Sequence, residues 1–131
     1  MRLYLDTSAL VKLIVAKAES DALSEYLRCF AEDFLFTAAL TRTELVHAVA
    51  DGGQPAVTEA RILLDSIDTV VLSRALLDDA GMLPPPRLRT LDAIHLAAAQ
   101  RAGRSLRAVI TYDSRMTEAA TLLGIPTVSP A

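Results

Sequence analysis

The sequence has too few cysteines and histidines for several kinds of site. Cys29 is the only cysteine among 131 residues, so no disulfide can form within the chain. Cys29 lies in a stretch with helical apolar periodicity, and we expect it to be a small buried residue. The two histidines, His47 and His95, belong to no cluster with the spacing of zinc ligands. These absences exclude a disulfide framework and an ordinary zinc site.

Other absences limit location and chemistry. No apolar run approaches the length of a membrane span, and the first residues, MRLYLD, do not resemble a signal peptide, so we expect a cytoplasmic protein with no membrane contact. Residues 6–9 (DTSA), which follow the first predicted strand, are not a glycine-rich phosphate loop. The chain has no nucleophile elbow either, which argues against a Ser-His-Asp hydrolase.

The composition indicates one folded domain over residues 1–131. Apolar residues make up 52% of the chain and the mean hydropathy is +0.34, so the chain can bury a proper core. The formal net charge is -3. A protein that coats nucleic acid would be basic, whereas an enzyme that reaches phosphates through metal ions need not be. The charge therefore excludes a coat protein and leaves a metal-dependent enzyme open.

Short apolar segments alternate with longer periodic segments along the chain. Ser73 and Thr90 are predicted helix N-caps, and the prolines at 84–86 are predicted to form an extended loop. The alternation predicts an α/β fold with a parallel sheet covered by helices on both faces. The predicted strands are 2–5, 34–37, 69–72, 108–112 and 125–128, and the predicted helices are 8–17, 21–31, 39–50, 55–66, 73–82, 90–102 and 114–123.

Four acidic residues lie at the ends or starts of apolar segments, far apart in the chain. They are Asp6, Glu44, Asp92 and Asp113. Asp6 directly follows the first predicted strand and Asp113 follows the fourth. Because ligands of parallel α/β sheets bind beyond the carboxyl ends of the strands, both residues point to the expected site. Carboxylates gathered there would repel one another, and a bound divalent cation is the economical explanation.

Each acid taken singly has a structural interpretation. Asp6 and Asp113 can be helix N-caps, although Ser8 can take that role in place of Asp6. Asp92 lies in a first helical turn, where a carboxylate interacts well with the helix dipole. Glu44 lies inside a helix, where glutamate usually faces solvent. The four together favour a site for Mg²⁺ or Mn²⁺, which prefer oxygen ligands.

Two further features are open to more than one interpretation. His95 follows Asp92 by three residues, so it shares the same helix face and has either a structural role or a role in metal or acid–base chemistry. Residues 87–115 are rich in arginine. We expect the arginines of this stretch to hold an anionic substrate or an acidic partner, or else to form a solvated helix face. The arginines singled out for substrate binding are Arg87, Arg89 and Arg115.

The segments around the four acids resemble a known family. The opening LYLDTSALVKL, then TRTELVHAV, RTLDAIHLAAA and VITYDSRM, are similar to the motifs of the PIN domain, and more narrowly to VapC-type toxins of bacterial toxin–antitoxin pairs. The resemblance covers about residues 3–128. It implies a three-layer α/β/α sandwich with a mostly parallel central sheet. It also implies an Mg²⁺- or Mn²⁺-dependent ribonuclease that acts on RNA, forms a homodimer and is inhibited by a VapB-type antitoxin.

The resemblance assigns roles to particular positions. Asp6, Glu44, Asp92 and Asp113 match the four catalytic, metal-binding acids, and Ser8 and Thr111 match hydroxyls that hydrogen-bond them. A bound metal would lower the pKa of a water and polarise the scissile phosphate. We therefore expect RNA products with 5′-phosphate and 3′-hydroxyl ends.

Three alternatives remain open from the sequence. A phosphohydrolase of the haloacid-dehalogenase type has a second aspartate two positions after the first, where this chain has Ser8. A response-regulator receiver needs a phosphoacceptor aspartate after its third strand, which reads TVVLS here. A non-enzymatic α/β interaction module would use the acids only as caps. The first helices also have apolar residues that we expect to bind a partner: Leu10, Val11, Ile14, Leu23, Tyr26 and Leu27.

Overall fold

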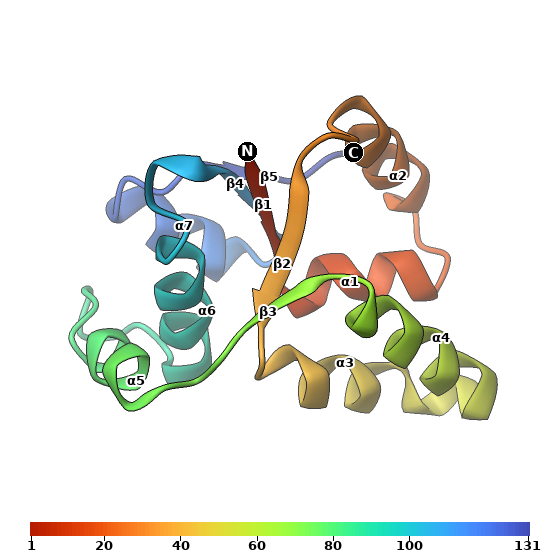
Figure 1. Ribbon diagram of the computed structural model, residues 1–131, viewed down its shortest axis with the longest axis horizontal. Helices are drawn as coiled ribbons and strands as arrows, with labels where there is room; N and C mark the ends of the chain where they lie inside the picture. Colours follow the sequence, from red (N-terminus) through yellow and green to blue (C-terminus); the bar gives the residue numbers. More distant parts are fainter.

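The computed structural model describes all 131 residues and has a central sheet between two layers of helices (Figure 1). The strands are β1 (Arg2–Leu5), β2 (Phe34–Ala38), β3 (Asp68–Val70), β4 (Leu106–Ile110) and β5 (Thr127–Val128). The α-helices are α1 (Thr7–Ile14), α2 (Ser20–Cys29), α3 (Thr41–Val49), α4 (Gly53–Asp65), α5 (Arg74–Gly81), α6 (Thr90–Gln100) and α7 (Ser114–Leu122). Two short 3₁₀ turns lie at Ala50–Gly52 and Gly103–Ser105. None of the helices combines the length and the apolar character that a membrane span requires.

The sheet is entirely parallel, with the strand order β3-β2-β1-β4-β5. β2 and β3 follow one another on one side of β1, and β4 and β5 lie on the other side. The order therefore reverses between β1 and β4, and the crevice beyond their carboxyl ends is where α/β sheets bind ligands. The prediction of a parallel sheet with helices on both faces is confirmed.

Alternation along β1 divides the core in two. Leu3 and Leu5 pack with residues of α1–α4 on one face of the sheet, whereas Tyr4 packs with residues of α5–α7 on the other. All three side chains are fully buried. This alternation is the ordinary pleat of a strand, and it points Tyr4 alone toward α6. Figure 1 shows the two groups of helices on either side of the sheet.

Three local predictions were wrong. Cys29 is exposed, because it lies off the apolar stripe by which α2 packs on the core. Thr90 is not an N-cap: Arg89 holds that position and makes no capping hydrogen bond with its side chain. The first helix ends at Ile14 and not near residue 17: Val15 is extended, and the Ser20 hydroxyl donates to the Lys12 carbonyl at 2.7 Å in place of a further helical turn.

Other predictions are confirmed. Ser73 caps α5 by accepting a hydrogen bond from the backbone of Leu76 at 3.1 Å. The prolines at 84–86 lie in the loop between α5 and α6, as predicted, but the loop is not extended: it bends at 84–85 and turns at 86–87, where the Leu88 N–H donates to the Pro85 carbonyl at 2.9 Å. Gly124, with a positive φ of 71°, follows α7 and lets the chain turn into β5.

Candidate active site

Asp6 is the buried acid of the site. It directly follows β1 and caps α1, and its Oδ1 accepts hydrogen bonds from the Ala9 backbone at 3.0 Å and from the Ser8 hydroxyl at 2.6 Å. Its Oδ2 accepts a hydrogen bond from Thr111. Burial raises the pKa of Asp6, and the hydrogen bonds from Ser8 and Thr111 act against that rise. Asp6 is therefore both the helix cap and a member of the site, and Ser8 does not replace it as the cap.

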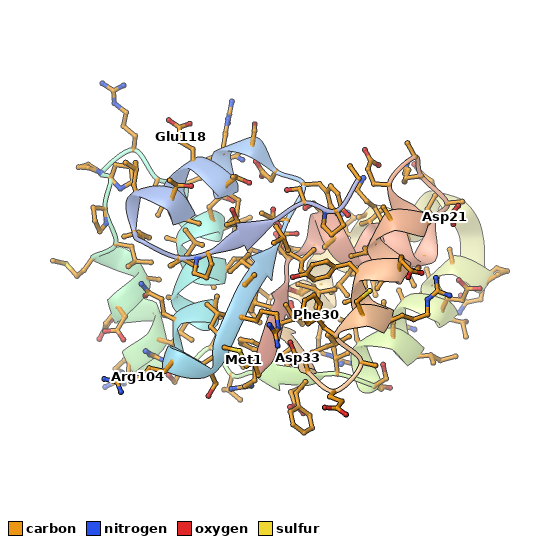
Figure 2. All side chains as sticks on the ribbon, turned by 90° about the horizontal axis from the view of Figure 1, so that it is seen from above. Met1, Asp21, Phe30, Asp33, Arg104 and Glu118 are labelled. Atoms are coloured by element: carbon orange, nitrogen blue, oxygen red, sulfur yellow. The ribbon has the colours of Figure 1, made fainter.

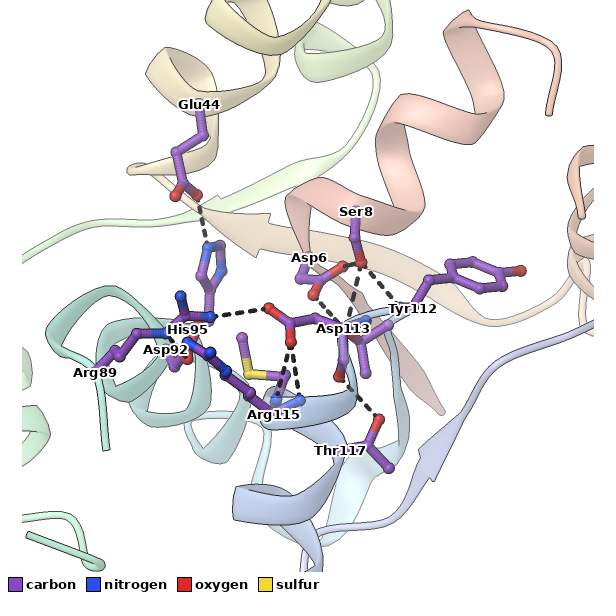
Figure 3. A network of polar contacts seen from close by, with 12 residues as sticks. Asp6, Ser8, Glu44, Arg89, Asp92, His95, Tyr112, Asp113, Arg115 and Thr117 are labelled. Carbon is purple, nitrogen blue, oxygen red and sulfur yellow. Dashed lines mark hydrogen bonds and ion pairs between the residues drawn. The ribbon is translucent and has the colours of Figure 1, made fainter. Parts of the chain in front are cut away.

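Ser8 and Thr111 join the ends of β1 and β4. The Ser8 hydroxyl accepts a hydrogen bond from the Tyr112 backbone at 2.9 Å, and the Thr111 hydroxyl accepts one from the Asp113 backbone at 3.1 Å. Each hydroxyl also donates to Asp6. The two residues thus tie the Asp6 carboxylate to the segment that carries Asp113, and Figure 3 shows Ser8 between Asp6 and Tyr112.

Asp113 lies after β4 and caps α7. Its Oδ1 accepts hydrogen bonds from the backbones of Arg115 at 2.9 Å and Met116 at 3.4 Å. Its Oδ2 takes no part in the cap and lies 3.4 Å from Nη2 of Arg89. The cap thus uses one oxygen of Asp113 and leaves the other to face the site.

Arg89 connects Asp113 with Asp92. Asp92 lies in the first turn of α6 with only 10% of its side chain exposed, and its Oδ2 is 3.2 Å from Nε of Arg89. A single guanidinium therefore bridges two carboxylates from different elements (Figure 3). Arg89 itself is 54% exposed, so its position is set by these ion pairs and not by packing.

Glu44 is held by side chains from two other elements. Its Oε1 lies 2.7 Å from Nε2 of His95 and accepts a hydrogen bond from the Thr7 hydroxyl at 2.7 Å. Nδ1 of His95 in turn lies 2.6 Å from the hydroxyl of Tyr4. Burial opposes ionisation of Glu44, but the hydrogen bonds from His95 and Thr7 outweigh it and lower the pKa of Glu44. Glu44 does not face bulk solvent as an ordinary helical glutamate would.

The donor chemistry of the acids fits a hard divalent cation, although their present arrangement does not enclose one. All four contribute carboxylate oxygens, the ligands that Mg²⁺ and Mn²⁺ prefer. No group of three or more histidines, cysteines or acids stands close enough together to hold a metal. The guanidinium of Arg89 instead supplies the positive charge between Asp92 and Asp113. A metal shared by these two acids would have to displace Arg89.

Comparison with known families identifies the fold and the family. Residues 3–122 match the profile of the PIN domain. The chain belongs to the PIN domain family. Membership in it removes the haloacid-dehalogenase and receiver alternatives, and it agrees with the resemblance of the motifs around Asp6, Glu44, Asp92 and Asp113.

Relatives match this PIN domain along nearly its whole length. The chain is 46% identical to Ribonuclease VapC46 of Mycobacterium tuberculosis over 98% of both chains. It is 47% identical to Ribonuclease VapC35 of the same species, over 98% of this chain and 96% of that protein. It is 42% identical to Ribonuclease VapC47 of Mycobacterium tuberculosis, over 98% of this chain and 96% of that protein.

Solved structures share the fold of this PIN domain. Mycobacterium tuberculosis VapC20, described as a sarcin-ricin loop cleaving toxin, superposes with a TM-score of 0.75 at 17% identity, over 98% of this chain and 99% of that one. A toxin–antitoxin complex from Klebsiella pneumoniae gives 0.73 at 21% identity, over 98% of both chains. VapBC2 from Rickettsia felis, bound to a DNA fragment from its promoter, gives 0.73 at 13% identity over 100% of both.

An open cavity of about 320 Å³ lies beside Asp92 in this PIN domain. Arg87 and Arg115 line it, and neither makes an ion pair within the chain. The structure therefore brings two of the three predicted arginines to the cavity with free charge, whereas Arg89 is occupied by the acids. The full lining is Pro85, Arg87, Leu88, Arg89, Asp92, Arg115, Glu118, Ala119 and Leu122.

Sequence reasoning missed Tyr4 and Thr7 as neighbours of the site and left His95 without an assigned partner. Tyr4 and His95 are 91 residues apart, and His95 and Glu44 are 51 apart. One signal was available: the alternation of β1 turns Tyr4 away from Leu3 and Leu5, and a buried phenol needs a hydrogen-bond partner. The sequence did not reveal which partner that is.

Proposed function

We propose that this PIN domain is a metal-dependent endoribonuclease and the toxin of a VapBC-type toxin–antitoxin pair. The observation that supports this most directly is its 42–47% identity, over nearly full length, to proteins named Ribonuclease VapC. Ribonucleases of the PIN family are generally dependent on divalent metal ions. The acids beside the point of strand reversal are in keeping with this activity.

Asp6, Glu44, Asp92 and Asp113 are the residues that would hold Mg²⁺ or Mn²⁺. When bound, the metal would supply a water with a lowered pKa and polarise a phosphate of the RNA. Ser8 and Thr111 orient Asp6, as their hydrogen bonds to it indicate. Arg89 neutralises Asp92 and Asp113 until a metal takes its place.

The cavity beside Asp92 is proposed to take the sugar–phosphate backbone of the RNA. Arg87 and Arg115 would contact phosphates there, because both are exposed and unpaired. Arg89 would join them only after it leaves Asp92 and Asp113. Arg87 and Arg115 would therefore be able to bind RNA with or without the metal, whereas Arg89 would be able to bind RNA only when the metal is bound.

The partner is proposed to be a VapB-type antitoxin that packs on α1 and α2. Leu10 and Leu23, expected on that surface, are fully buried in the core, so they do not contribute to it. The other expected residues remain partly exposed on these helices: Val11, Ile14, Tyr26 and Leu27. We further propose a homodimer in the cytoplasm, and sedimentation of the purified chain tests the dimer.

The test of the activity is to incubate total bacterial RNA with the purified protein, with Mg²⁺ or with chelator, and to map the cut ends. Cleavage should occur only with Mg²⁺ and leave 5′-phosphate and 3′-hydroxyl ends. Asp92→Asn should remove it, whereas Asp79→Asn, which changes an exposed acid of α5, should not. Equal cleavage in chelator, or by Asp92→Asn, would refute the proposal, and no cleavage at all would favour an interaction module.

A further inference from the structure

A buried row of hydrogen bonds runs from β1 to Glu44. The Tyr4 hydroxyl lies 2.6 Å from Nδ1 of His95, and Nε2 of His95 lies 2.7 Å from Oε1 of Glu44. Tyr4 is fully buried and His95 is 3% exposed. The row therefore begins in the core and ends at the edge of the site. Because Tyr4 and His95 are buried, water cannot take over the hydrogen bond between them.

The chemistry of the row assigns its protons. A carboxylate oxygen only accepts, so the hydrogen between Oε1 of Glu44 and His95 belongs to Nε2. The Tyr4 hydroxyl lies within hydrogen-bond distance of Nδ1 and holds the ring from its other side.

Both bonds to Glu44 converge on one oxygen. His95 and Thr7 each donate to Oε1, and no group of the chain donates to Oε2. The Glu44 side chain is 24% exposed, so Oε2 remains open to a water or another ligand. Because Oε1 of Glu44 is held by two hydrogen bonds, the direction of Oε2 is fixed as well.

We propose that Tyr4 and His95 are positioning residues that aim Oε2 of Glu44 into the metal centre. The proposal rests on the proposed function for the identity of that centre, but the tautomer and the hydrogen bonds can be measured without metal or RNA. Neither residue touches substrate: Tyr4 acts through His95, and His95 acts through Glu44. Partners of this kind typically change metal affinity or activity by roughly 10- to 100-fold when removed.

The first experiment records long-range ¹H–¹⁵N correlations of the histidine rings in the metal-free protein. His95 should show a hydrogen held on Nε2, whereas His47, which is exposed, serves as the internal control. Tyr4→Phe should shift the ¹⁵N resonance of Nδ1 of His95, because that nitrogen loses its hydrogen-bond partner, while Nε2 keeps the hydrogen that it donates to Glu44. Tyr112→Phe, which removes a hydroxyl bonded to the Pro130 carbonyl, should not. A His95 ring protonated on Nδ1 alone, or one unchanged by Tyr4→Phe, would overturn the proposal.

The second experiment measures Mn²⁺ affinity by titration calorimetry. His95→Gln keeps a side-chain N–H that can donate to Glu44, whereas His95→Leu has none. Affinity should therefore fall in the order wild type, His95→Gln, His95→Leu, with the last about tenfold or more below wild type. His47→Gln should match wild type. Equal affinity in all variants would overturn the positioning role. If wild type binds no Mn²⁺, the proposed metal centre fails, and the tautomer measurement decides the orienting role of Tyr4 alone.

Discussion

Nη2 of Arg89 lies 3.4 Å from Oδ2 of Asp113, across 24 residues of sequence. The same guanidinium contacts Asp92, so one arginine neutralises two acids that a metal would share. Because both interactions favour the same place for a positive charge, Arg89 and a divalent ion should compete for it.

Replacing Arg89 should therefore tighten metal binding. In Arg89→Gln the two ion pairs are lost, and the Mn²⁺ dissociation constant should fall severalfold, because partly exposed pairs of this kind contribute up to about 1 kcal/mol. Titration calorimetry checks this. Arg104→Gln removes the same charge from an exposed residue without an ion pair and should leave affinity nearly unchanged. Weaker Mn²⁺ binding by Arg89→Gln would show that Arg89 assists the metal and does not compete with it.

Asp6→Asn should stop cleavage without unfolding the protein. Burial raises the pKa of Asp6 above its ordinary value, so ionisation of this group costs stability, and the cost grows as pH rises through the folded pKa. Asparagine removes the charge and keeps an oxygen to cap α1, although the bond from Thr111 is weakened, at a cost of about 1 kcal/mol. Urea unfolding at neutral pH should show equal or higher stability.

A large loss of stability in Asp6→Asn would contradict this expectation and assign Asp6 mainly to capping. Ser73→Ala provides the comparison, because Ser73 is a helix cap away from the site and its loss should cost about 1 kcal/mol.

The pH dependence of folding should contain a contribution from Asp33. Hydrogen bonding from Arg107 lowers the pKa of Asp33, and the terminal amine of Met1 adds to this effect from 3.2 Å. Figure 2 shows Met1 and Asp33 together at the amino end of the sheet. A lowered pKa means that the stabilisation is complete above the ordinary carboxyl pKa of about 3.9 and is lost as pH falls through the folded value.

Asp33→Asn should therefore lower the melting temperature at neutral pH, and its difference from wild type should shrink on acidification. Glu32→Gln, a change at an exposed neighbour without an ion pair, should melt like wild type throughout. A difference between Asp33→Asn and wild type that stays constant down to pH 3 would refute the assignment.

Arg87 and Arg115 should set the salt dependence of RNA binding. Each arginine that neutralises a phosphate of a single strand contributes about 0.7 to the slope of log affinity against log salt. Arg87→Gln and Arg115→Gln should each reduce the slope by about that amount. Filter binding of an RNA oligonucleotide to the metal-free protein at several salt concentrations checks this, with Arg104→Gln as the control. Unchanged slopes would remove the cavity as the RNA site.

The parts of the site that follow from strand ends were predictable from sequence. Asp6 directly follows β1 and Asp113 lies three residues after the end of β4, and parallel strands place their carboxyl ends at one edge. Local rules also predicted the cap at Ser73. The buried face of α2 was predicted less well. Cys29 was expected to be buried, but the helix packs on the core through its apolar stripe and leaves Cys29 exposed, and only the packing decides which face is buried.

The pairings between side chains were not predictable, because they depend on tertiary contact. The sequence around Arg89 does not show whether this arginine is free to bind RNA or forms ion pairs with Asp92 and Asp113. The same holds for His95, whose two partners come from β1 and α3. Composition and spacing reveal which groups are available, and the fold determines which of them meet.

The most direct test of the account is the anomalous diffraction of crystals grown with Mn²⁺. The account predicts an Mn²⁺ peak within about 2.6 Å of carboxylate oxygens of Asp92 and at least one of Asp6, Glu44 and Asp113, with Arg89 withdrawn from Asp92. A structure in which saturating Mn²⁺ leaves Arg89 on both acids and binds elsewhere, or not at all, would contradict it.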